Sequence, residues 1–397
     1  MYYTVLMRKT YQVGVGIAFL LLCTGFGLYT VHTHMAQSSS VWSLRDGDID
    51  QGEEAAEDPR VYSAAAAATA STPKVSYQVS SSTPQFVLLS FDGSKSVDML
   101  NDTLAFETKM ASEGKPLHFT YFINAAYFLT KSTANLYQGP GHSRGVSAIG
   151  FSDSTHDIAA RVRAFNTAYA AGNEIGSHSA GHFNGAQWSF DEWKQEFDSF
   201  ASLMANVQQN NASQKIDAPI FLDSIRGFRA PELGVNANLY KVLQDEHFTY
   251  DGSGVGAMYR WPKQDTNGIW HIPLGTIFVG PNKSPSISMD YSLWMLQSGA
   301  KNVATKGTPL WNTYFNEVES AYMDYFNTNY HGTRAPVVIG HHFSLWNDGV
   351  YWEAMKAFAE QVCGQPHVQC VTFSTLVDYL NTTGAPTMVS QYPTTSR

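Results

Sequence analysis

The chain has 397 residues, of which 44% are hydrophobic and 15% charged, enough apolar side chains for one large or two ordinary globular domains. The formal net charge of −9 excludes a strongly basic protein and argues against a nucleic-acid partner. Aromatic residues make up 13% of the chain, which fits a large aromatic core and also a cleft that stacks on sugar rings.

The first residues predict a membrane anchor. Arg8 and Lys9 precede an uncharged run, residues 13–31, which is long enough to span a bilayer and exceeds the apolar core of a signal peptide. Positive charge before the run places the N-terminus in the cytoplasm. We therefore expect residues 1–35 to be an uncleaved anchor, with a cleaved signal peptide as the alternative. The rest of the chain should then face the periplasm or the cell exterior.

The next segment, residues 36–84, is poor in large apolar residues and rich in Asp, Glu, Ala, Ser and Thr. This composition predicts a disordered linker. Residues 382–397 predict a loose polar tail. The folded domain should therefore occupy residues 85–381.

Within that domain, strand-like runs alternate with helical patterns. Strands are predicted at residues 86–92, 117–123, 174–177, 225–229, 248–251, 270–274, 276–279, 337–342 and 368–373, and helices at 97–110, 158–171, 193–207, 237–244, 311–325, 352–362 and 375–380. This alternation predicts an α/β fold with a mainly parallel sheet or barrel. In such folds the site forms at the carboxyl ends of the strands, where Asp92, His178, Arg229 and His341 fall. The loops 136–153 and 251–267 are long enough to shape substrate binding.

Two histidines four residues apart, His178 and His182, are candidate metal ligands. Four residues is about one helical turn, so both imidazoles can point the same way and share a divalent cation. Ser179 stands where the His-Glu-x-x-His motif of metalloproteases has its glutamate, so that motif is absent.

Four stretches resemble, in order, the motifs of the polysaccharide deacetylase family (NodB-like, carbohydrate esterase family 4). They are Leu88-Leu-Ser-Phe-Asp92, His178-Ser-Ala-Gly-His182, Gly227-Phe-Arg-Ala-Pro231 and Val337-Val-Ile-Gly-His-His342. The family motifs are Thr-Phe-Asp-Asp, His-Ser/Thr-x-x-His, Arg-x-Pro and Leu-x-His. The resemblance implies an irregular (β/α) barrel and a metal-dependent hydrolase that removes acetyl groups from an N- or O-acetylated polysaccharide.

The resemblance also implies roles for individual residues. His178 and His182 would bind the cation, with zinc as the expected metal. Asp92 would be the catalytic base, and Arg229 would hold it. A backbone N–H near Leu233 would supply an oxyanion donor.

The general acid implied by the resemblance is His341, with its neighbour His342 as the alternative. Adjacent residues of a strand face opposite ways, so only one of the two should serve. Asp290 is the carboxylate expected to tune His341, and Asp251 is the second choice.

One position departs from the family pattern. Gly93 stands where the family has a second aspartate, its third metal ligand, and glycine has no side chain to coordinate with. Ser94 is a poor ligand, and Asp98 is predicted to lie in a helix. The alternative function is therefore a glycan-binding domain that keeps the fold with weakened catalysis.

The chain contains three cysteines. Cys363 and Cys370 flank a short segment with turn-forming Gly364 and Pro366, so they predict a disulfide in an oxidising compartment. Cys23 lies in the predicted anchor.

Overall fold

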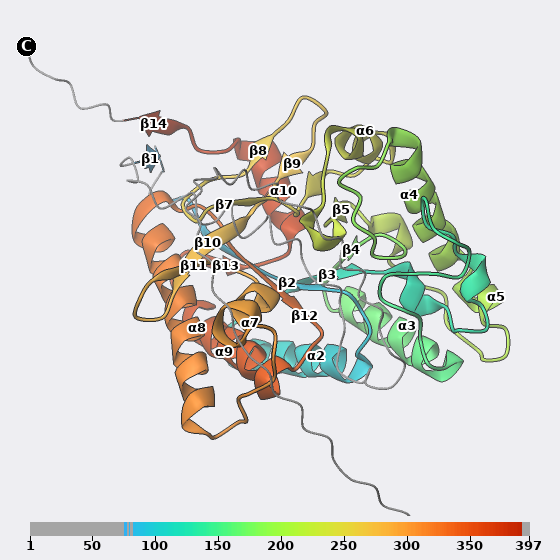
Figure 1. Cartoon of the computed structure of the whole chain (residues 1–397). Coiled ribbons are helices and arrows are strands. Elements are labelled where there is room, and N and C mark those ends of the chain that lie inside the picture. The colour runs from blue at the N-terminus through green and yellow to red at the C-terminus, as the bar shows by residue number, and fades with distance from the viewer. Residues whose placement is uncertain (1–74, 78, 80–81, 391–397) are drawn as a thin grey trace, which may run out of the picture. The chain divides into compact units, whose positions relative to one another are not determined.

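The structure is a computed structural model that describes residues 75–77, 79 and 82–390 (Figure 1). The predicted anchor, residues 1–35, and most of the predicted linker lie outside the described residues. No helix in the described part of the chain has the length and apolar character needed to cross a bilayer.

A curled, mainly parallel sheet forms the centre of the domain. Its strands lie in the order β12 (Val337–His342), β2 (Gln85–Asp92), β3 (Phe119–Ile123), β4 (Glu174–Ser177), β5 (Gly227–Phe228), β6 (Tyr250–Asp251), β9 (Trp270–His271) and β8 (Lys263–Gln264). Only β8 is antiparallel to its neighbour, and β13 (Val368–Cys370) pairs with the first residues of β2.

A second sheet lies beside the free edge of β12. It consists of β7 (Val255–Ala257), β10 (Leu274–Val279) and β11 (Ser284–Ile287). It is linked to β12 by a parallel bridge between Met289 and Gly340. The two sheets together form an incomplete barrel, which confirms the predicted α/β class and mainly parallel sheet.

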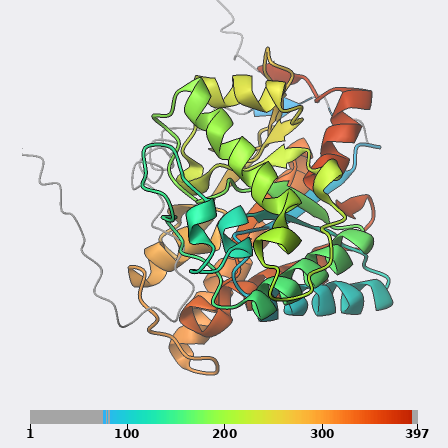
Figure 2. The same ribbon diagram turned by 90° about the vertical axis from the view of Figure 1, so that its right-hand side faces the viewer.

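Helices cover the outer face of the curled sheet (Figures 1 and 2). In chain order they are α2 (Val97–Ser112), α3 (Thr155–Ala170), α4 (Phe190–Ala205), α5 (Val207–Asn210), α6 (Ala237–Asp245), α7 (Asp290–Ser298), α8 (Pro309–Thr328) and α9 (Trp346–Val362). Helix α10 (Phe373–Thr383) packs instead against the inner face, where the Phe373 ring contacts that of Phe122. Helix α2 packs beside α3, α8 beside α9, and α4 beside α6. Short 3-10 turns include η2 (Ala125–Phe128) and η5 (Pro231–Leu233). Ser189 is the N-cap residue of α4 and forms a capping box with Glu192.

The two faces of the sheet carry different side chains because strand residues alternate between them. The outer face, including Phe91, Tyr121 and Ile123, packs against the helices in the largest apolar cluster. The inner face, including Leu88 and Phe122, belongs to a second cluster. The strand ends of this inner face carry the polar groups described below.

Two short strands lie in segments predicted to be unstructured. Strand β1 (Val75–Tyr77), inside the predicted linker, pairs antiparallel with β14 (Met388–Ser390), inside the predicted tail. The interpretation of these two stretches as a disordered linker and a loose tail is therefore wrong at these residues. Each strand is completed by a partner more than 300 residues away, which local composition cannot reveal.

The predicted disulfide joins Cys363, at the end of α9, to Cys370 in β13, with their Cα atoms 5.8 Å apart. Closing so short a loop restricts the unfolded chain only modestly. We expect the Cys363→Ser, Cys370→Ser double variant to lose on the order of 2 kcal/mol of unfolding free energy, measured by urea denaturation. Non-reduced peptide mass spectrometry of the wild type should show the bridge; two freely alkylated thiols there would contradict it.

Candidate active site

The carboxyl ends of five adjacent strands meet at one edge of the sheet. Parallel pairing sets His342 beside Asp92, and Asp92 beside Phe122. Ser177 pairs with Phe228 one strand further on, so the residues that follow them, His178 and Arg229, also come side by side. The predicted residues Asp92, His178 and Arg229 are therefore brought together on the inner face.

Asp92 and Arg229 form a buried ion pair. Arg229 donates from one terminal nitrogen to Asp92 Oδ1 at 2.8 Å and to Ser90 Oγ at 2.9 Å, and from Nε to the Gly252 carbonyl at 3.1 Å. The guanidinium lies 4.4 Å from the centre of the Phe122 ring. Burial raises the pKa of Asp92, while the charge and hydrogen bond of Arg229 lower it. Arg229 thus fixes the orientation of the Asp92 carboxylate, which is the contact that the resemblance implies.

His178 and His182 lie close together, with ring centres 4.9 Å apart, but not on a helical turn. They occupy the loop after β4, in which Ser179 and His182 have positive φ values of 66° and 60°. The prediction that the two rings are close is confirmed, but the predicted reason, a shared helical turn, is wrong. The bend of the loop, stabilised by a bond from the His182 N–H to Ser179 Oγ, brings the rings together.

The two histidines have the chemistry of metal ligands. His178 Nδ1 lies 2.7 Å from the Arg229 carbonyl, which fixes the tautomer and leaves Nε2 as the coordinating atom. His182 Nδ1 is buried and has no hydrogen-bond partner among the described residues. Burial lowers the pKa of each ring to about 3, so both are neutral at physiological pH. These two nitrogens fit a divalent cation such as zinc.

His178 and His182 have no third His, Cys, Asp or Glu side chain grouped with them as a metal ligand in the described part of the chain. This agrees with the glycine at position 93. Gly93 has a φ of 83°, a conformation that side chains with a Cβ rarely adopt.

Gly93→Asp is therefore expected to destabilise the fold rather than restore a ligand. The left-handed backbone costs a residue with a Cβ about 1–2 kcal/mol. We expect lower unfolding free energy by urea denaturation, with Gly93→Asn losing less because asparagine tolerates this region. Calorimetric titration should show no gain in zinc affinity. A Gly93→Asp variant of wild-type stability and tighter zinc binding would overturn this expectation.

The histidine loop is held from behind by a glutamate that the sequence analysis missed. Glu196, on α4, accepts hydrogen bonds through Oε1 from the N–H groups of Ala180 at 2.9 Å and Gly181 at 2.7 Å. Its Oε2 accepts from the Tyr137 hydroxyl at 2.8 Å. Burial raises the pKa of Glu196. The only signal in the sequence was that Glu196 is an acidic residue among the apolar positions of the helix predicted at residues 193–207.

Tyr137 belongs to the long loop 136–153, which was predicted to shape the site. The Ala148 N–H also donates to the Gly181 carbonyl at 2.9 Å. In the same loop, His142 stacks on Phe183 with ring centres 3.6 Å apart. This loop thus packs directly on the residues that surround His182.

The structure separates the two neighbouring histidines of β12. His341 is on the outer face, where its Nε2 lies 3.0 Å from the Tyr322 hydroxyl and its ring packs against Phe91. His342 is on the inner face beside Asp92. The preference for His341 is therefore corrected to its alternative, His342, because the pairing register directs only the second histidine toward the site.

Asp290 holds His342 in place. Its Oδ1 lies 2.6 Å from His342 Nδ1, and its Oδ2 accepts from the His342 N–H at 2.8 Å. The distance from Asp290 Oδ2 to His341 Nδ1 is 3.9 Å. The predicted carboxylate–histidine pair thus exists, with His342 rather than His341 as the closely bound partner.

The remaining predicted groups have other partners. Asp251 accepts from the Ser253 N–H at 3.0 Å and lies 3.4 Å from His271 Nδ1, so it does not pair with a histidine of β12. The Leu233 N–H donates to the Ala230 carbonyl at 3.1 Å within η5.

Four histidines at this end of the domain predict acid sensitivity. Burial lowers the pKa of His178, His182, His341 and His342 to about 3. In the unfolded chain, these histidines take up protons below the ordinary histidine pKa of about 6.5. In the folded protein they stay neutral until the pH approaches 3. The contribution of these histidines to the unfolding free energy should therefore be fully present above pH ~6.5. It should fall as the pH drops toward 3, by up to about 1.4 kcal/mol per pH unit for each histidine.

Urea denaturation of the chelator-treated protein between pH 4 and 8 measures this loss. The exposed His331→Gln variant is the control and should keep the wild-type slope. The raised pKa values of buried Asp92, Glu174 and Glu196 act in the opposite direction, so the histidine contribution is measured as the difference between the wild type and His341→Gln. Equal pH slopes in these two proteins would contradict the burial of a neutral histidine at position 341.

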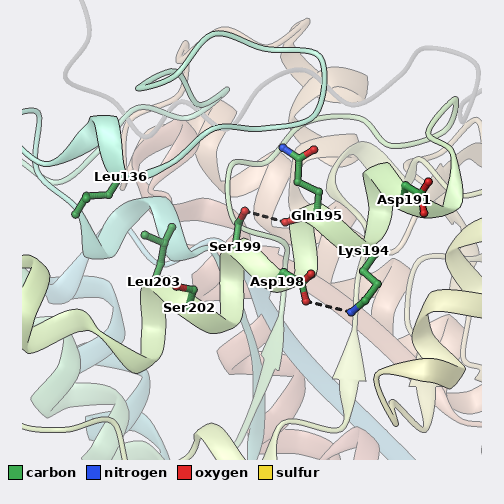
Figure 3. A pocket seen from close by; sticks show the side chains of 8 residues that line it. All are labelled: Leu136, Asp191, Lys194, Gln195, Asp198, Ser199, Ser202 and Leu203. Atoms are coloured by element: carbon green, nitrogen blue, oxygen red, sulfur yellow. Dashed lines mark hydrogen bonds and ion pairs between the residues drawn. The ribbon is translucent and has the colours of Figure 1, made fainter.

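Two surface hollows lie away from these residues. One, of about 420 Å³, lies over α4 (Figure 3) and is lined by Leu136, Asp191, Lys194, Gln195, Asp198, Ser199, Ser202 and Leu203. Its lysine is paired with Asp198 and Glu246. The other, of about 440 Å³, lies between α2 and α9. Neither contains a predicted site residue, so the buried cluster at the strand ends remains the candidate active site.

No protein-family profile matches this chain, and no curated protein matches it. Among solved structures, it is similar to a protein of Mycobacterium smegmatis described as a polysaccharide deacetylase, with 13% identity, a TM-score of 0.46, and 81% of this chain and 99% of that chain covered. It is also similar to the peptidoglycan deacetylase PdaC from Bacillus subtilis, with 12% identity, a TM-score of 0.38, and coverage of 76% and 96%. A CE4 family pseudoenzyme from Bacillus anthracis matches with 12% identity, a TM-score of 0.38, and coverage of 74% and 66%.

Proposed function

We propose that this protein is a metal-dependent hydrolase that removes acetyl groups from an acetylated polysaccharide outside the cytoplasm. One observation carries the proposal. A buried Asp92–Arg229 pair, two neutral histidines and the Asp290–His342 pair converge on the inner face at one end of the sheet. Hydrolysis of an amide or ester requires a base, an acid and a means of polarising the carbonyl, and this cluster contains candidates for each.

Asp92 is the proposed base. It accepts a proton from the attacking water, while Arg229 keeps the carboxylate oriented. His178 and His182 are the ligands that would hold a divalent cation, which when bound supplies Lewis-acid polarisation of the carbonyl. Their neutral state at physiological pH keeps the nitrogen lone pairs available for binding.

His342 is the proposed acid. It would donate a proton to the departing amine or alcohol. Burial lowers the pKa of His342 to about 3, and the Asp290 carboxylate at Nδ1 opposes this by stabilising the imidazolium that the role requires. The same contact fixes the ring, so that Nε2 is the atom that transfers the proton.

The location outside the cytoplasm is also proposed. The uncharged run at residues 13–31 and the Cys363–Cys370 disulfide support it, because disulfides persist in oxidising compartments. Labelling of a His331→Cys variant in intact cells with a membrane-impermeant thiol reagent tests it, because position 331 is exposed whereas Cys363 and Cys370 are buried. Labelling in intact cells is expected, and labelling only after lysis would overturn it.

The decisive experiment measures acetate release. The full chain is incubated with acetylated chitin oligomers, peptidoglycan and acetylated exopolysaccharide, with zinc, cobalt, nickel or chelator. Release from at least one substrate, lost on chelation and in Asp92→Asn, is expected. Absence of release from every substrate with every metal would overturn the proposal.

A second function is favoured by Gly93, which removes one expected metal ligand. A glycan-binding domain with weakened catalysis would bind the same polymers without turnover. Its binding would be unaffected by chelator and by His178→Ala. Binding of that kind, together with no acetate release, would identify this alternative.

A further inference from the structure

Strand β3 contributes one polar side chain to the strand ends, that of Asn124, which no sequence motif identified. Asn124 follows Ile123 in extended conformation, with φ −103° and ψ 130°. Ile123 faces the outer apolar cluster, so alternation directs Asn124 to the inner face, like Phe122 beside Arg229. The sheet order therefore places Asn124 between Asp92 on β2 and His178 after β4.

Asn124 is fully buried, and one of its two polar atoms is used. Its Nδ2 donates to the His178 carbonyl. Because that carbonyl is an acceptor, the atom facing it must be the amide nitrogen, which settles the orientation of the group. The other atom, Oδ1, has no hydrogen-bond partner among the described residues. It does not cap the turn η2 that follows.

A buried amide oxygen that finds no partner at all is unfavourable by about 1–3 kcal/mol, so Asn124 Oδ1 is available to accept from water or to bind a cation. Three features specify the class of ligand. Asn124 Oδ1 can only accept or coordinate, and the Asn124 side chain is hydrogen-bonded to the backbone of His178. His182 Nδ1 is a second buried atom without a described partner. Two imidazole nitrogens and an amide oxygen are all cation ligands.

We propose that Asn124 supplies, through Oδ1, the third protein donor to the cation bound by His178 and His182, in place of the carboxylate that Gly93 cannot provide. This inference rests on the metal dependence in the proposed function. Because an amide is neutral, the bound cation keeps more of its positive charge than it would beside a carboxylate. The affinity for zinc or cobalt should be correspondingly weaker than in a site with a carboxylate ligand.

Ser94 Oγ and Ser344 Oγ, which follow β2 and β12, are also buried and have no described partner. Ser94 follows Gly93 beyond the end of β2, and its backbone carbonyl accepts from Arg161 Nε. Asn124 is the stronger candidate because its hydrogen bond ties it to His178.

The test uses cobalt, whose absorption spectrum reports its ligands. In Asn124→Cys, a thiolate at position 124 should add a sulfur-to-cobalt charge-transfer band in the near ultraviolet, absent from the wild type. In Asn124→Ala, the cobalt Kd measured by calorimetry should rise at least about 10-fold. Thermal melts of the full chain confirm that each variant is folded.

Asn211 provides the matched control. It is also buried, donates from Nδ2 to the Phe128 and Val207 carbonyls, and has an Oδ1 without a described partner. Asn211→Cys and Asn211→Ala should show neither the band nor the loss of affinity. A folded Asn124→Cys without the band, together with an unchanged Kd in Asn124→Ala, would overturn the inference.

His178→Ala separates this failure from failure of the proposed function. One possible result is that the wild type binds cobalt, that His178→Ala abolishes this binding and that the Asn124 variants bind normally. In that case only the Asn124 assignment fails. If the wild type binds no cobalt, both the inference and the metal-dependent mechanism fail. Cobalt binding with the Asn124 signature but without acetate release would support the inference while overturning the hydrolase.

Discussion

His342→Gln should lower kcat for acetate release by about 10²–10⁴-fold, whereas His341→Gln should leave kcat within a few-fold of the wild type. His342 lies on the inner face beside Asp92 and is held by Asp290. His341 lies on the outer face against Tyr322. The first substitution removes the proposed acid, and the second removes only a packed side chain and its hydrogen bond.

Steady-state kinetics on the purified variants measures this difference, with melts to correct for the folded fraction. Asp290→Asn should lower kcat in the same direction, because it weakens support for the His342 imidazolium. Equal losses in the two histidine variants, or a larger loss in His341→Gln, would contradict the assignment of the acid to His342.

Glu196→Leu should lower the affinity for zinc by about 10–100-fold and destabilise the fold, whereas Glu196→Gln should do little of either. The leucine leaves the N–H groups of Ala180 and Gly181 without their acceptor, at about 1–3 kcal/mol for each. The glutamine keeps an oxygen for both N–H groups, and the Tyr137 hydroxyl can accept from its amide nitrogen.

Calorimetric titration with zinc and urea denaturation measure the two effects. Tyr137→Phe is the companion variant, because it removes the hydroxyl and leaves both backbone bonds to Glu196 intact; it should resemble Glu196→Gln. If Glu196→Leu binds zinc as tightly as the wild type, the loop does not need this carboxylate to hold His178 and His182.

Local sequence patterns predicted most of the helices and strands and the general position of the site. Alternating apolar runs and helical spacing are local properties, and they predicted the curled parallel sheet and its carboxyl edge. The short spacing of Cys363 and Cys370 predicted their disulfide, which is present. The residue motifs located Asp92, Arg229 and the histidine pair, which the fold brings to one edge.

Which side chains face that edge depends on how the strands pair in the folded protein. Strand alternation shows that His341 and His342 point opposite ways, but only the pairing with β2 determines which of them lies beside Asp92. Glu196 and Asn124 act on backbone groups 15 to 54 residues away, and β1 finds its partner β14 at the other end of the chain. Contacts of this kind depend on the assembled sheet and leave no local periodicity, which is why the sequence could not reveal them.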